Sequence, residues 1–191
     1  MAKDLVVGSA DLSHLEKAIA AHLTGLGAKH DLEKWLAAEH GETTICCLNG
    51  ASVVEFLRHV VRCEGYSDED TGMAEGCNGN SKYRNIPWWD DAVWLPMELQ
   101  PVILGVDEPF FVGSCSALLQ ELRDLQDISQ IQLGSAPEGY EEMRADIQKF
   151  YRSDAPFRLT DADCVRWIWL ALRDGAELAI KEHTVLYAGP D

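Results

Sequence analysis

The sequence has few basic residues. Only 16 Lys and Arg stand against 32 Asp and Glu, and the formal net charge at pH 7 is −16. A surface this negative repels phosphate backbones, so we expect no direct binding of nucleic acid. The same charge attracts a basic protein, although solubility alone is an alternative reason for a high net charge. The charge balance therefore favours a basic protein partner.

Long apolar runs are also missing, since no segment approaches the eighteen or more apolar residues of a membrane-spanning helix. Residues 1–23 lack the basic region, apolar core and cleavage site of a secretory signal. We therefore expect a cytoplasmic protein that does not associate with membranes. The six cysteines form no Cys-x-x-Cys pair, which in a reducing compartment predicts thiols that are mostly buried.

Familiar cofactor motifs are absent as well. The sequence has no Gly-x-Gly-x-x-Gly, no phosphate-binding loop and no HExxH, so we expect no nucleotide, metal or other cofactor. Glu55, His59 and Cys63 share one face of a predicted helix, a spacing that suits a metal or an activated thiol. Because Arg58 and Arg62 lie close by, we interpret this face as an ordinary solvent-facing helix side.

Helical and strand patterns alternate irregularly along the chain, which argues against a doubly wound parallel sheet. We predict a single α+β domain over residues 1–191, with about six helices packed on a small mixed or antiparallel sheet. One long polar and acidic loop is expected over residues 64–87. The apolar spacing predicts helices over 13–23, 31–40, 52–63, 117–128, 137–151 and 160–179, and strands over 43–49, 100–106, 109–113 and 184–188.

Three local patterns refine this prediction. The run "SVVE" at residues 52–55 has the spacing of a capping box at the start of a helix. Gly175 interrupts a helical stripe that continues on both sides, which predicts a closely packed glycine. On the same helix Trp167 belongs to the apolar stripe, whereas Trp169 lies off it and is expected either to be exposed at the surface or to cover a second element.

The segment "NIPWWDDAVWLP", residues 85–96, concentrates aromatic surface between two prolines. Exposed tryptophans beside aspartates suit a partner that carries Arg or Lys, through cation–π contacts and charge-assisted hydrogen bonds. The alternative is that the tryptophans belong to the core and the aspartates to turns. The predicted partner-binding residues are Trp88, Trp89, Asp90, Asp91 and Trp94, together with Asp68, Glu69, Asp70 and Glu75 of the acidic loop.

The acidic loop carries the type of oxygen ligands that calcium prefers. An EF-hand starting at Asp68 would place Gly72 at the fifth position and Gly79 at the twelfth, where acidic ligands belong. The motif therefore fails, and a solvated acidic loop is the better interpretation.

Cys115 in "PFFVGSCSALL" follows a predicted strand and precedes a predicted helix. A helix N-terminus lowers the pKa of a thiol and offers backbone amides to an oxyanion, so Cys115 is a weak catalytic candidate. In the alternative interpretation Ser114 or Ser116 caps the helix and Cys115 fills the core. No partner base can be identified from the sequence.

Taken as a whole, the sequence favours a non-enzymatic acidic binding protein over an enzyme. The specific hypothesis is an immunity or antitoxin-type inhibitor that covers a basic partner, such as a bacterial nuclease-like toxin. Two alternatives stay open: a thiol-dependent hydrolase or transferase using Cys115, and a structural subunit of a larger complex. The sequence leaves the oligomeric state, the strand order and the burial of each tryptophan undecided.

Overall fold

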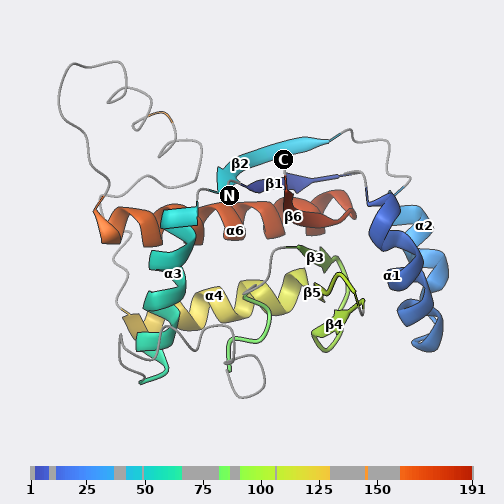
Figure 1. The fold of residues 1–191 in the computed structure, drawn as a ribbon, viewed down its shortest axis with the longest axis horizontal. Helices are drawn as coiled ribbons and strands as arrows, with labels where there is room; N and C mark the ends of the chain where they lie inside the picture. Colours follow the sequence, from blue (N-terminus) through green and yellow to red (C-terminus); the bar gives the residue numbers. More distant parts are fainter. Residues whose placement is uncertain are drawn as a thin grey trace.

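Five helices and six strands make up most of the described chain (Figure 1). The computed structural model describes residues 3–8, 12–36, 42–48, 50–65, 82–86, 91–105, 107–129, 145 and 160–190. The helices are α1 (Ser13–Gly25), α2 (Lys29–Leu36), α3 (Gly50–Cys63), α4 (Cys115–Ser129) and α6 (Asp161–Glu182). The strands are β1 (Lys3–Val7), β2 (Thr43–Leu48), β3 (Ala92–Leu95), β4 (Val102–Leu104), β5 (Phe110–Ser114) and β6 (Leu186–Pro190).

The six strands form one mixed sheet in the order β2-β1-β6-β3-β5-β4. Strands β3 and β5 run parallel, and every other neighbouring pair is antiparallel. The predicted α+β class and mixed sheet are confirmed, but the sheet is larger than expected because β1 and β3 were not predicted. The helix expected over 137–151 and most of the acidic loop lie outside the described residues.

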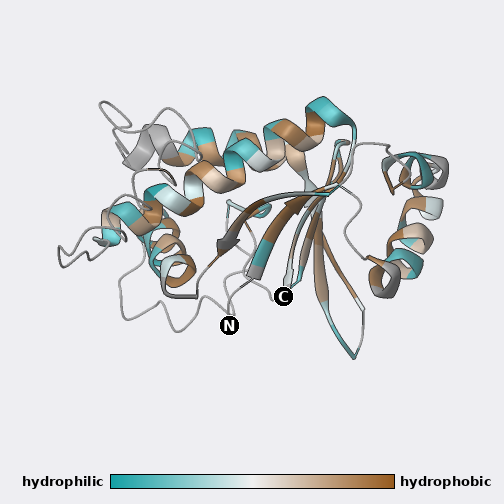
Figure 2. Cartoon of the chain, turned by 90° about the horizontal axis from the view of Figure 1, so that it is seen from above, coloured by the Kyte–Doolittle hydropathy of each residue, from teal (hydrophilic) through white to brown (hydrophobic). Residues whose placement is uncertain are grey.

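The sheet lies between two helical layers, with α1 and α2 on one side and α3, α4 and α6 on the other (Figure 2). Alternate residues of each strand point to opposite faces. In β3, Ala92 and Trp94 join the core under α3, α4 and α6, whereas Val93 and Leu95 join the core under α1 and α2. All four residues are buried, so the sequence of β3 lacks the alternation of polar and apolar residues that marks a half-buried strand.

Helix α6 is the long helix that the sequence predicted, and it begins at a capping box made by Thr160 and Asp163. A methyl group on Gly175 would lie 2.8 Å from Leu186 Cδ1, which confirms the close packing expected of this glycine. Of the two alternatives for Trp169, packing against a second element is the one found, because Trp169 is 2% exposed; Trp167 is partly buried and packs against the core. Trp169 is buried because its indole reaches α4, where Nε1 donates a 2.8 Å hydrogen bond to the Leu122 carbonyl.

The predicted capping box at Ser52 is wrong, because α3 begins two residues earlier at Gly50. Ser52 is therefore inside the first turn and buried, and the Glu55 carboxylate pairs with Arg58 along the helix. The helix itself is correctly predicted, since Val60 and Val61 are fully buried.

Two expectations from composition can be compared with the described residues. No disulfide joins Cys46, Cys63, Cys115 or Cys164, and three of these four cysteines are buried. None of the helices in this part of the chain is long and apolar enough to cross a lipid bilayer.

Candidate partner-binding surface

Trp94, one of the predicted anchors, lies in the core. Its side chain is fully buried, it packs against the Phe111 ring at 6.0 Å between centroids, and its Nε1 donates a 2.8 Å hydrogen bond to the Asn85 carbonyl. An indole in this position has no surface to offer a partner. The core alternative therefore describes Trp94, and burial on both faces of β3 is the physical reason.

The other predicted contact residues have different outcomes. Asp91 is described and half-buried at the start of β3, where its backbone carbonyl accepts a hydrogen bond from Phe111 and the Tyr187 hydroxyl lies 3.5 Å from its carboxylate. The rest lie outside the described residues and stay predictions: Trp88, Trp89, Asp90, Asp68, Glu69, Asp70 and Glu75.

A network centred on Asn85 and Glu121 holds the segment before β3 onto α4. The Asn85 backbone amide donates to both Glu121 carboxylate oxygens, at 3.0 and 2.7 Å, and Asn85 Nδ2 donates to Oε1 at 2.9 Å. The Asn85 side-chain oxygen in turn accepts a 3.0 Å hydrogen bond from the Ser114 amide at the end of β5. One asparagine thus joins α4, β5 and, through Trp94, β3.

Glu121 is mostly buried, and this burial raises the pKa of its carboxyl from 4.5 to about 7. The hydrogen bonds from Asn85 oppose this effect, because they stabilise the ionised carboxylate. The cost of desolvation exceeds their contribution. Glu121 is therefore the described acid whose charge state depends most clearly on pH near neutrality.

Cys115 is the first residue of α4, as the sequence suggested, but it is fully buried. Burial raises the pKa of the thiol to about 12, which is the opposite of the change an activated nucleophile needs. The Ser114 hydroxyl accepts a 3.3 Å hydrogen bond from the Ala117 amide and so caps the helix. The alternative interpretation of the sequence is therefore the one found, in which Ser114 caps the helix and Cys115 packs in the core.

The His59 and Cys63 pair on α3 is formed, with 3.5 Å between Nε2 and Sγ. Burial is the main reason that the pKa of His59 is lowered and that of Cys63 raised, so both groups tend toward their neutral forms. Glu55 is paired with Arg58 instead of joining them. In the described part of the chain no third His, Cys, Asp or Glu completes a metal site with this pair.

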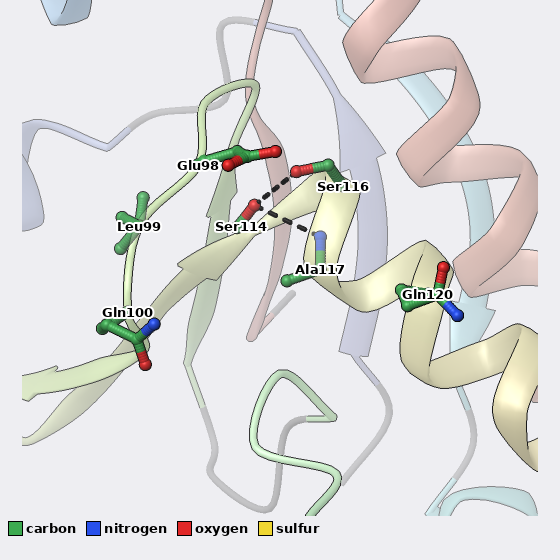
Figure 3. Close-up of a pocket in the computed structure, with 7 residues that line it drawn as sticks. All are labelled: Glu98, Leu99, Gln100, Ser114, Ser116, Ala117 and Gln120. Carbon is green, nitrogen blue, oxygen red and sulfur yellow. Dashed lines mark hydrogen bonds between the residues drawn. The ribbon is translucent and has the colours of Figure 1, made fainter.

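A polar groove of about 640 Å³ opens where the parallel strands β3 and β5 end (Figure 3). One wall is the segment Glu98–Gln100 that follows β3, and the other is the start of α4. Glu98 extends from the first wall toward Ser116 on the second (Figure 3). The groove is lined by Glu98, Leu99, Gln100, Ser114, Ser116, Ala117 and Gln120, and no cation is among these residues.

The groove belongs to a segment without any positive charge. Residues 85–122 contain six acids and no Lys, Arg or His, a feature of the sequence that motifs and helical spacing do not reveal. The ion pairs formed between described residues lie on other elements: Asp31–Lys34 on α2, Glu55–Arg58 on α3, and Arg173–Asp174 and Lys181–Glu182 on α6. The exposed acids of this segment consequently have no cationic partner among the described residues.

The exposed acids of this cation-free segment, residues 85–122, lie at two opposite edges of the sheet. Asp107 and Glu108 are in the turn between β4 and β5, at the same edge as Asp91 at the start of β3. Glu98 follows the end of β3 and is therefore at the other edge, beside the groove. The structure thus places Asp91 with two acids that the sequence analysis had not selected.

These features define a class: an acidic α+β protein whose central segment presents carboxylates and no cations. The model of the protein family described as "Putative DNA-mimic protein" matches residues 90–188, more than half of the sequence, and the chain belongs to this family. The match supports an acidic protein-binding protein and not the narrower expectation of an immunity protein. No curated protein and no solved structure matches the chain.

Proposed function

We propose that the chain is a non-enzymatic acidic protein that binds a DNA-binding protein at the basic surface with which this partner holds DNA. The observation that carries the proposal is that the cation-free segment falls almost wholly within the residues matched by the DNA-mimic family. A DNA-binding surface is rich in Lys and Arg because it neutralises phosphates. Carboxylates without cations of their own are suited to occupy such a surface.

The electrostatics of the chain also support this proposal. A net charge of −16 draws a basic partner from a distance, and exposed carboxylates then provide charge-assisted hydrogen bonds at contact. In residues 85–122 no Lys or Arg competes with the partner for these carboxylates. The described acids expected to contribute are Asp91, Glu98, Asp107 and Glu108.

The residues predicted from the acidic loop and the tryptophan segment complete the proposal. Trp88, Trp89 and Asp90 adjoin Asp91 in the sequence, so aromatic contacts to partner arginines are expected beside the acids of that sheet edge. Asp68, Glu69, Asp70 and Glu75 would add charge and speed association without forming the centre of the contact.

The test is displacement of proteins from DNA. DNA-binding proteins from the organism that encodes the chain are loaded on immobilised duplex DNA, and the purified chain is added at physiological salt. The expected result is release of a particular protein, identified by mass spectrometry, which then binds either the chain or duplex DNA but not both. Release of no protein, or a partner that binds the chain and DNA together, would refute the proposal.

Two variants of equal net charge make the test specific. Glu98→Gln, Asp107→Asn and Glu108→Gln neutralise three exposed acids of the cation-free segment. The control, Glu16→Gln, Glu33→Gln and Glu177→Gln, neutralises three exposed acids on α1, α2 and α6. We expect only the first variant to lose most of the displacement, whereas equal losses would show that net charge alone is responsible.

A further inference from the structure

The structure assigns the groove between Glu98 and α4 as a pocket for an arginine side chain of the DNA-binding partner. This inference rests on the proposed function for the identity of the partner. Its physical basis is the polar lining of the groove, the position of Glu98 and the absence of a cation from both walls.

Several groups that line the groove can accept hydrogen bonds. The Glu98 carboxylate lies on one wall, and the exposed Ser116 hydroxyl lies on the other, where the buried Ser114 hydroxyl holds it at 2.9 Å. Gln120 uses its side-chain amide group as a donor to Asp124 at 2.8 Å, which leaves its carbonyl oxygen as an acceptor. An arginine guanidinium has five N–H donors in a planar fork and suits such a set better than the compact ammonium of lysine.

The N-terminus of α4 is the strongest argument against a cation in this groove, since the helix macrodipole favours an anion there. Its effect is equivalent to about half a positive charge, which is less than the full negative charge of the Glu98 carboxylate. The Ala117 amide is also already bonded to the Ser114 hydroxyl. With a net charge of −16 on the whole chain, the balance at the groove favours a cation.

The location of the groove supports its use in recognition. It opens beyond the carboxyl ends of the parallel strands β3 and β5, and proteins with parallel α/β sheets commonly bind ligands at this end of their strands. Its walls are positioned by buried parts of the fold, because Ser114 is fully buried and is held by Asn85. Its volume of about 640 Å³ admits a side chain together with water.

The experiment uses a short probe that carries one arginine, acetyl-Gly-Gly-Arg-Gly-Gly-amide, titrated into the full chain labelled with nitrogen-15. We expect NMR shifts centred on the amides of Ser116 and Ala117 and the side-chain amides of Gln100 and Gln120. The lysine analogue of the probe should bind more weakly. Glu98→Gln should weaken binding about fivefold, as expected for loss of one partly exposed ion pair.

The matched control is Glu108→Gln, which removes the same charge at the opposite edge of the sheet. Binding to this variant should change little. Three results would each refute the assignment of the groove as an arginine pocket. They are equal losses of binding in both variants, NMR shifts spread over all acidic surfaces, and saturation of the same amides by inorganic phosphate in place of the arginine probe. Such a failure leaves the DNA displacement result intact, whereas absence of displacement refutes the proposed function independently.

Discussion

The buried carboxyl of Glu121 predicts how stability depends on pH. Its pKa is raised from 4.5 to about 7 in the folded protein, so between these values the folded state holds a proton that the unfolded state has released. The contribution of Glu121 to stability is therefore full below pH 4.5 and is lost as the pH rises through 7. With about 1.4 kcal/mol for each pKa unit, the loss amounts to at most about 3 kcal/mol.

The assay is urea unfolding of the wild type and of Glu121→Gln at intervals from pH 4.5 to 8.5. The variant has no group to titrate at this position, so its stability should fall less than that of the wild type by roughly 2–3 kcal/mol over this range. Comparing the two proteins removes the repulsion among the many other acids, which both share. The variant is expected to be less stable at low pH, because its amide donor faces the Asn85 amide.

Asp124→Asn is the matched control, because Asp124 is an exposed acid on the same helix. Its pH profile should run parallel to that of the wild type. Carbon-13 NMR of the Glu121 carboxyl provides a second measurement, with an expected midpoint near pH 7. Parallel profiles for the wild type and Glu121→Gln, together with a midpoint near 4.5, would refute the reasoning from burial.

Two other predictions concern the core. Trp94→Ala should lower the free energy of unfolding by about 3–5 kcal/mol, because it empties a fully buried indole site, and Trp94→Phe should lower it less. Urea unfolding measures both changes. A change below about 1 kcal/mol for Trp94→Ala would contradict the burial of this side chain. Cys115 should resist iodoacetamide in the folded protein at pH 8 and react after unfolding, because its pKa is raised to about 12, and selective labelling of native Cys115, detected by peptide mass spectrometry, would contradict this.

The helices could be predicted from the sequence wherever one face of a helix is apolar. The stripe of Leu15, Ile19 and Leu23 in α1 is fully or almost fully buried, and so is that of Leu118, Leu122 and Leu125 in α4. These stripes depend on spacing within one helix, so local pattern is sufficient. Strand β3 could not be found in this way, because both of its faces are buried and its residues lie within the tryptophan segment, residues 85–96.

The candidate site was predictable only in its charge. The excess of acids is a property of composition, and the cation-free segment is visible in the printed sequence. The contact of Glu121 with Asn85, 36 residues away, and the position of Glu98 opposite Ser116 at the groove depend on how the strands are ordered. The burial of Trp169 could not be decided from the sequence for the same reason, since the helix against which it packs is distant in sequence.

The place of β6 in the sheet has a consequence for synthesis of the chain. β6 lies between β1 and β3, so it connects the strands from the first part of the chain to those of the acidic segment. A nascent chain on the ribosome therefore cannot join the two parts of the sheet until residues 186–190 have emerged. Until then β1 and β3 each keep an unpaired edge, and the strong negative charge of the chain opposes edge-to-edge aggregation with other copies.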